Sequence, residues 1–156
     1  MKNVFAPLVI AVLISAVVNQ ALYFLAREGA GEPFVVDFDG QGASAAMPIV
    51  VIAPALFTVF QGIVGGVAVA ALALATKRPR ANWTWLTLLG LTASFIPTAF
   101  ASSGVASTFL WLSLMHLVAG GLIIPLVSRV MPVAKEEEPK TPGDVTPSGD
   151  SPRQGR

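Results

Sequence analysis

The sequence predicts an all-α protein, a four-helix transmembrane bundle with a disordered C-terminal tail. Composition is the first reason: 54% of the 156 residues are hydrophobic, only 12% are charged, and the mean hydropathy is +0.70, which is far from the balance of a soluble domain. The second reason is that the chain contains four long apolar runs. Apart from Arg129 near the end of the last run, they contain no Asp, Glu, Lys or Arg. We therefore expect residues 1–132 to form one transmembrane domain.

The first apolar run covers about residues 4–26 and is expected to be a retained span. It follows a short positive start at Lys2 and so resembles the beginning of a signal peptide. The apolar region of a signal peptide is only about 7–15 residues long, however, whereas this run is long enough to cross a bilayer. Ser15, Asn19 and Tyr23 recur every four residues and share one helix face. We expect that face to point into the bundle.

The other three apolar runs predict three further spans. Pro54, Pro97 and Pro125 lie within them. Membrane helices tolerate proline where neighbouring groups satisfy the freed carbonyl groups, so we expect kinks rather than breaks. The expected spans are residues 47–76, 83–102 and 106–130.

Basic residues near the ends of the spans predict the orientation. With four crossings they gather on one side of the membrane: Lys2, Lys77, Arg78, Arg80, Arg129 and Lys135. Because Lys and Arg beside spans are retained on the cytoplasmic side, we expect a multi-pass protein of the cell membrane with both termini in the cytoplasm. Trp83 and Trp85 would then be aromatic anchors at the cytoplasmic interface.

Two segments lie outside the predicted spans. In the loop of residues 28–46, residues 34–39 partly alternate in the manner of a strand, and we expect the loop to fold back as a lid over the bundle. Asp37, Asp39 and Gln41 resemble the start of a calcium loop, but the distal Glu of such a loop is missing, which favours a solvated turn. Residues 133–156 are rich in charged residues, Pro, Gly and Ser, which predicts a disordered cytoplasmic tail.

Polar side chains inside the spans are the candidates for a binding site, because lipid offers no hydrogen-bond partners. Counting from the span centres places them in the middle and outer parts of the bundle, which suggests a shallow pocket open toward the loop. The ligand-binding candidates are Asn19, Gln20, Gln61, Ser94 and His116. The alternative for Asn19 and Gln61 is that they only hold helices together.

Glycines spaced four residues apart predict close contacts between helices. Gly62 and Gly66 form such a pair, and Gly120 adds a further point of close approach, together with Gly65 and Gly121. Small residues at these positions allow two helix backbones to approach each other in the membrane.

His116 is the only side chain in the runs that titrates near neutral pH. Three roles stay open for it: a hydrogen-bonded structural histidine, ligand or proton handling, and a subunit contact. The chain has no Cys and no second His, so we expect no metal site and no cofactor. The spans also lack the carboxylate or activated nucleophile of a catalytic site, which argues against an enzyme and gives no catalytic residue.

Several short segments resemble a known family. They are residues 18–23 with Ala26 and Arg27, residues 94–97, and residues 114–118 with Ile124, Pro125 and Arg129. In order and span position they resemble a family of small, uncharacterised four-span integral membrane proteins of actinobacteria, classified as a domain of unknown function. The resemblance covers about residues 4–130. It implies a four-helix membrane domain with an Asn in the first span and a His in the fourth, and it implies no activity.

The favoured function is that of a non-enzymatic membrane protein, either an accessory subunit or a bundle that binds a small ligand. One alternative is a small transporter. Proton-coupled exporters generally rely on a carboxylate in the membrane, so the coupling would have to fall to His116. A membrane-embedded enzyme is the second alternative. The expected partners are the lipid bilayer and either other membrane proteins or further copies of this chain, and no nucleic acid.

Overall fold

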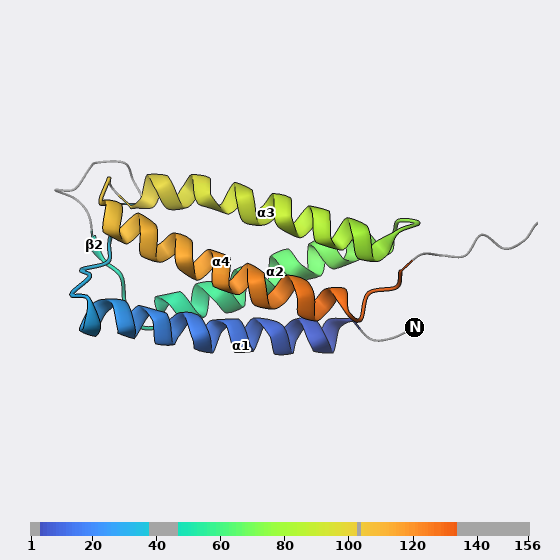
Figure 1. Ribbon diagram of the computed structural model, residues 1–156, viewed down its shortest axis with the longest axis horizontal. Coiled ribbons are helices and arrows are strands. Elements are labelled where there is room, and N and C mark those ends of the chain that lie inside the picture. Colours follow the sequence, from blue (N-terminus) through green and yellow to red (C-terminus); the bar gives the residue numbers. More distant parts are fainter. Residues whose placement is uncertain (1–3, 38–46, 103, 134–156) are drawn as a thin grey trace, which may run out of the picture.

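The computed structural model describes residues 4–37, 47–102 and 104–133. Within these residues the chain forms four long α-helices, each long and apolar enough to cross a membrane, as the sequence predicts. The predicted tail after Val133, and Asp39 and Gln41 of the loop, lie outside the described residues. The elements are α1 (Phe5–Phe24), the π-helical turn η1 (Leu25–Gly29), β1 (Val35–Val36), β2 (Met47–Pro48), α2 (Ala53–Leu74), α3 (Pro79–Ala101) and α4 (Ala106–Ser128) (Figure 1).

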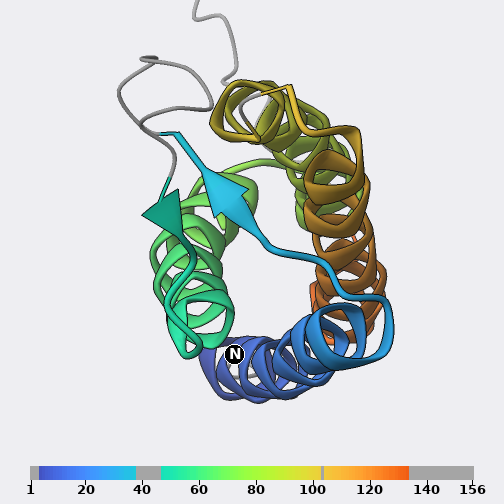
Figure 2. The ribbon, with the colours of Figure 1, turned by 90° about the vertical axis from the view of Figure 1, so that its left-hand side faces the viewer.

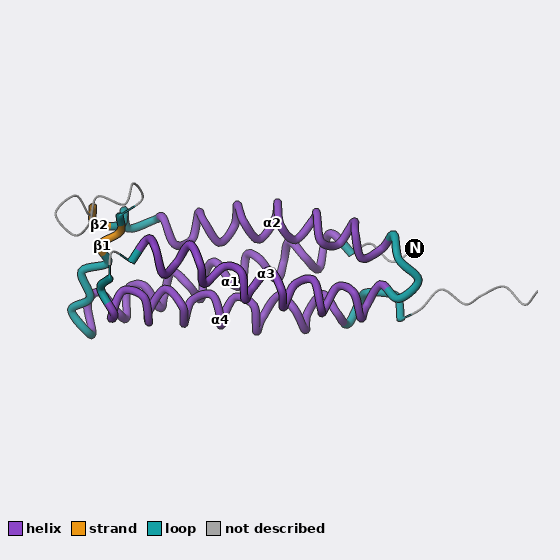
Figure 3. The backbone as a smooth tube through the Cα atoms, turned by 90° about the horizontal axis from the view of Figure 1, so that it is seen from above, coloured by secondary structure: helices purple, strands orange, loops and turns teal. Residues whose placement is uncertain are grey.

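The helices run alternately up and down, so the connections gather at two ends of the bundle (Figure 1). We call one end the terminal end: it holds the start of α1, the link between α2 and α3, and the end of α4. The opposite loop end holds the segment between α1 and α2 and the turn between α3 and α4. Figure 3 shows the two short strands beyond the helices at the loop end.

Two helices begin at other residues than predicted. α2 starts at Ala53 and not at residue 47, because Met47 and Pro48 pair antiparallel with β1. α3 starts at Pro79, four residues before the expected position. Pro54 and Pro79 stand in the first turns of these helices, where a missing N–H costs no helical hydrogen bond.

The terminal half of the bundle has a packed apolar core to which all four helices contribute. Its buried residues are Val4, Leu8, Ala11, Val12, Ala70, Ala73, Trp83, Val127 and Met131. A Cβ added to Gly62 or Gly66 of α2 would lie 2.9 Å from Val12 or 2.8 Å from Leu8, and one added to Gly120 would lie 2.7 Å from Leu91. These three glycines therefore stand at close helix contacts.

Gly65 and Gly121 do not make the contacts expected of them. Each is exposed, and a Cβ added to either would meet no atom within 4 Å. Gly65 directly precedes Gly66, and Gly121 directly follows Gly120. Adjacent residues on a helix point about 100° apart, so Gly65 and Gly121 face away from the helix contact.

The prediction for Trp83 is wrong, and Trp85 alone has the exposure of an interfacial anchor. Trp83 of α3 is fully buried in the core of the terminal half, and its Nε1–H donates a hydrogen bond to the Ile124 carbonyl oxygen at 3.3 Å. Trp85 is 70% exposed. A position at the end of a span does not decide which face of the helix a residue occupies.

The described part of the loop folds back across the loop end of the bundle, as predicted. Figure 2 looks along the bundle from this end and shows β1 crossing it. Phe34 is fully buried with its ring centroid 4.8 Å from that of Tyr23, and its backbone has a φ of 46°. The Asp37 N–H donates a hydrogen bond to the Ala101 carbonyl oxygen at 2.9 Å, which ties β1 to the end of α3.

Candidate ligand cavity

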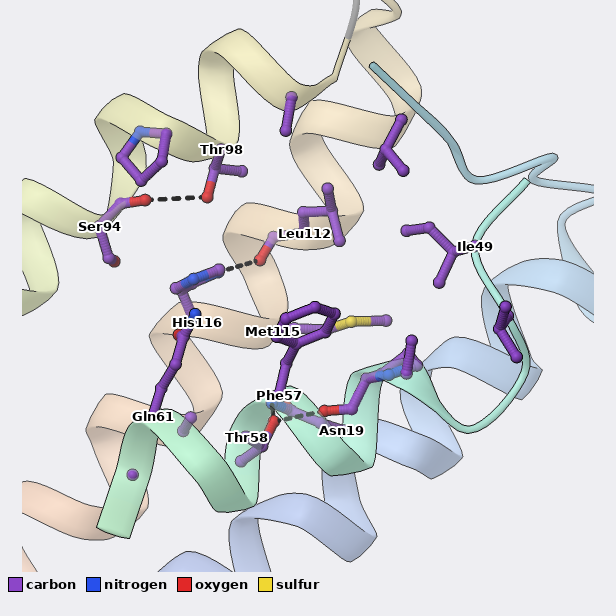
Figure 4. A pocket seen from close by; sticks show the side chains of 18 of the residues that line it. Asn19, Ile49, Phe57, Thr58, Gln61, Ser94, Thr98, Leu112, Met115 and His116 are labelled. Carbon is purple, nitrogen blue, oxygen red and sulfur yellow. Dashed lines mark hydrogen bonds between the residues drawn. The ribbon is translucent and has the colours of Figure 1, made fainter. Parts of the chain in front are cut away.

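A cavity of about 510 Å³ occupies the loop half of the bundle. Residues of all four helices line it (Figure 4). At the loop end it is lined by Val36, Pro48 and Ile49, which belong to the described residues 30–37 and 47–52 between η1 and α2, here called the lid segment. This volume lies within the range of small-molecule sites in proteins. Four of the five predicted ligand-binding residues line the cavity: Asn19, Gln61, Ser94 and His116.

Asn19 enters the cavity from the inward face of α1. Ser15, Asn19 and Tyr23 are all at least nine-tenths buried, which confirms the prediction from their four-residue spacing. The Asn19 Nδ2 donates a hydrogen bond to the Thr58 Oγ1 at 2.9 Å, and that hydroxyl donates to the Pro54 carbonyl oxygen at 2.7 Å.

The hydrogen-bond chain fixes which amide atom of Asn19 is free. A threonine hydroxyl has one hydrogen, and here it is used on the Pro54 carbonyl oxygen. Thr58 must therefore accept from Asn19, so the atom facing it is the Nδ2. The Asn19 Oδ1 is left buried without a hydrogen-bond partner in the described part of the chain.

His116 supplies a second acceptor. Its Nδ1 lies 2.8 Å from the Leu112 carbonyl oxygen, and because a carbonyl oxygen can only accept, the Nδ1 carries the hydrogen. In the neutral imidazole the Nε2 then has a free lone pair. The ring is tilted at 45° to that of Phe95, with 6.2 Å between the centroids.

Gln61, Ser94 and Thr98 add to the polar lining, and the Thr98 hydroxyl donates to the Ser94 carbonyl oxygen at 2.9 Å. The Gln61 side chain points from α2 toward the His116 ring (Figure 4) and offers both an amide N–H₂ and a carbonyl oxygen. The Ser94 hydroxyl donates to the Leu91 carbonyl oxygen of its own helix at 2.6 Å, so its oxygen faces the cavity only as an acceptor.

Gln20 is the one predicted candidate that does not line the cavity. Its Nε2 donates to the Val51 carbonyl oxygen at 2.8 Å, which fastens α1 to the segment before α2. The next residue after Asn19 on a helix points about 100° away, so the two amides cannot share one face.

A buried carboxylate at the loop end was not found from the sequence. Glu32 is 5% exposed, and its Oε1 accepts hydrogen bonds from the Thr108 hydroxyl of α4 and from the Phe34 N–H. It is absent from the residues that line the cavity. Gly31 and Pro33 flank Glu32, and no sequence signal distinguishes this Glu from Glu28, which is exposed.

The lid is also fastened from α1. The Tyr23 hydroxyl donates to the Ile49 carbonyl oxygen at 3.2 Å and accepts from the Arg27 Nη1 at 2.7 Å. Because Ile49 lines the cavity, this pair of bonds positions one of its walls.

The chemistry of the cavity is that of a neutral, acceptor-rich binding site. Among the described residues, none that lines it is Asp, Glu, Lys or Arg, and no group of three His, Cys, Asp or Glu lies close enough to hold a metal ion. The walls are otherwise apolar, with Phe57, Leu112 and Met115 among them. Such a site can bind an uncharged molecule and orient it by hydrogen bonds.

The fold and the cavity define a class: a small multi-pass membrane protein with an uncharged polar cavity inside a four-helix bundle. Within this class the chain belongs to DUF6069, a family of unknown function, whose model matches residues 1–132. The match covers the whole membrane domain and agrees with the resemblance seen in the sequence. No curated protein and no solved structure matches the chain.

Proposed function

We propose that this protein is a ligand-binding bundle, which holds an uncharged, largely apolar small molecule with a hydrogen-bond donor in the cavity. The unpaired Asn19 Oδ1 carries this proposal. A buried polar atom without a partner costs about 1–3 kcal/mol, and a ligand hydroxyl or N–H at this position would remove that cost.

The other cavity groups agree with a donor on the ligand. The His116 Nε2 lone pair and the Ser94 Oγ are acceptors, and Gln61 is able to adapt to either role. A charged ligand is disfavoured because no charged side chain is among the described residues that line the site, and an ion buried without a partner is costly. Binding of this kind requires neither proton relay nor bond chemistry at His116.

The test uses the full chain in lipid nanodiscs and a matched pair of compounds, 1-dodecanol and its methyl ether. Both fit an apolar site, but only the alcohol donates a hydrogen bond. We expect dodecanol to raise the melting temperature of the protein more than the ether does, because a molecule that binds only the folded state stabilises it.

The variants Asn19→Leu and Thr58→Val separate ligand binding from helix packing. Both remove the hydrogen bond between α1 and α2, but only Asn19→Leu removes the Oδ1 acceptor. We expect Asn19→Leu to abolish the advantage of dodecanol and Thr58→Val to retain it. Equal effects of the alcohol and the ether on the unmodified protein would refute the proposal.

A further inference from the structure

We propose that the ligand reaches the cavity from within the bilayer, through an opening between α2 and α3, and that the ligand is therefore a membrane-dissolved molecule. This inference rests on the proposed function, since it concerns the same cavity. Beyond the proposed function, it states by which route the ligand enters and that the ligand comes from the bilayer.

The first argument is the arrangement of α2. Its glycines Gly62 and Gly66 hold it against α1, and its last residues reach α3 through the short link at the terminal end. Figure 1 shows that α2 consequently crosses the bundle obliquely, from a position beside α1 at the loop end to one beside α3 at the terminal end. In the view along the bundle, α2 and α3 stand apart at the loop end (Figure 2).

The second argument is that lining residues on both of these helices are exposed. Phe57 of α2 lines the cavity and is 53% exposed, and Gln61 on the next turn is exposed as well. On α3, Pro97 both lines the cavity and is exposed. Lining residues of α1 and α4 are by contrast buried or half-buried, such as Asn19 and Met115.

The third argument is that several independent contacts hold the lid segment across the loop end. Glu32 and Asp37 of the lid segment are bonded to Thr108 and Ala101 at the ends of α4 and α3, and Val36 and Ile49 form apolar walls behind them. Access from water past β1 would require these contacts to break. Access between α2 and α3 requires none of the hydrogen bonds described here to break.

An opening within membrane-spanning helices selects its ligand by solubility as well as by fit. The molecules present at that depth are apolar, and ions are scarce there because their transfer into hydrocarbon is costly. A lipid-soluble alcohol or amide combines this solubility with a donor for the Asn19 Oδ1. The cavity thus suits a molecule with one small uncharged polar group on an apolar body.

The experiment measures access to a thiol inside the cavity. The chain contains no Cys, so Ala119→Cys or the near-isosteric Ser94→Cys introduces the only thiol, at a lining position. The full chain is reconstituted in vesicles and treated with N-dodecylmaleimide, which partitions into the bilayer, or with sulfonatoethyl methanethiosulfonate, which is charged and stays in water. Gly121→Cys is the lipid-facing control and Ala30→Cys the water-facing control, since both positions are exposed.

We expect the cavity thiol to react with the lipophilic reagent at a rate comparable to that of Gly121→Cys, and to be protected from the charged reagent. Phe57→Ala should widen the opening and raise the lipophilic rate several-fold. Leu56→Ala, a change at an exposed neighbour that does not line the cavity, should leave it unchanged.

Two other outcomes overturn the route. Rapid modification by the charged reagent would mean access from water and would leave ligand binding intact, whereas protection from both reagents would mean that the cavity is closed. If the lipophilic labelling occurs as expected but dodecanol and its ether act alike, the route stands and the proposed binding function fails.

Discussion

The carboxylate of Glu32 accepts a hydrogen bond from the hydroxyl of Thr108, and this contact joins the lid segment to the first turn of α4. Both side chains are at least 95% buried. Thr108→Val should therefore leave a buried carboxylate with one donor fewer, and hydrogen bonds to charged groups contribute about 1.5–3 kcal/mol.

We expect the lid to open locally in Thr108→Val while the four helices stay folded. Hydrogen–deuterium exchange of residues 30–37 should accelerate, with little change in the terminal half. Ser107→Ala, at the exposed neighbouring position, is the control and should exchange like the unmodified protein. Uniform acceleration throughout the bundle would contradict a role confined to the lid.

Gly62 is expected to be the least replaceable of the glycines in α2. A methyl group there would lie 2.9 Å from both γ-carbons of Val12, and a β-branched side chain in a helix has almost no alternative rotamer. Gly62→Ala should therefore destabilise the bundle by about 1–3 kcal/mol, measured by denaturant titration in mixed micelles.

Gly65→Ala provides the matched comparison on the same helix. Because its methyl group would meet open space, we expect it to be neutral or to stabilise by up to about 1 kcal/mol through helix propensity. Combining Gly62→Ala with Val12→Ala should recover part of the loss. Equal costs at positions 62 and 65 would show that helix contacts do not decide the outcome.

Filling the cavity should separate stability from binding. Ala119 lines the cavity from α4, and Ala119→Leu adds apolar volume where the bundle is hollow. We expect a gain in unfolding free energy of about 1 kcal/mol, as is common for cavity-filling changes, together with loss of the dodecanol-specific shift in melting temperature. A stabilised variant that still distinguishes dodecanol from its ether would place the ligand elsewhere.

Removal of the hydrogen bond should lower stability more at Trp83 than at His116. The bond of His116 goes to its own helix, whereas that of Trp83 joins α3 to α4. Interhelical bonds in membrane proteins contribute about 0.6 kcal/mol on average, so Trp83→Phe should cost about that much stability, and more than His116→Leu.

His116→Leu should instead weaken dodecanol binding. Loss of one acceptor corresponds to between about twofold and tenfold in affinity, which a titration of the melting temperature against dodecanol would resolve. Trp83→Phe should leave this affinity unchanged. A His116→Leu protein that binds dodecanol normally but unfolds more easily would assign the histidine a structural role.

Hydropathy and helical spacing were sufficient to predict the helices and the inward face of α1. They could not place the start of α2, because Met47 and Pro48 are as apolar as a span but form a strand over the loop end. The start of α3 was placed four residues too late, because Pro79 and Arg80 belong to the helix but are not part of the apolar run. Proline in the first turn marks these two starts better than hydropathy does.

The positions of polar residues along the spans were sufficient to predict most of the candidate site. One cavity is lined by Asn19, Gln61, Ser94 and His116. Polar side chains of a membrane helix face other helices or a cavity, because lipid offers them no hydrogen-bond partner. Gln20 and Trp83 were misplaced, since their surroundings depend on the rotation of each helix about its axis. Glu32 was missed because its burial depends on where the lid meets Thr108, a contact across 76 positions of sequence.

The positive φ of Phe34 has a consequence for how often the lid is detached. For a residue with a Cβ, the left-handed conformation costs about 1–2 kcal/mol, and a detached segment is free to leave it. That difference alone multiplies the population of the open lid by a factor of about 5–30 relative to an unstrained segment with the same contacts. Phe34→Gly removes both the strain and the ring that packs on Tyr23. A higher occupancy of the closed state in this variant would mean that the strain is the larger contribution, and a lower occupancy that the ring contact is.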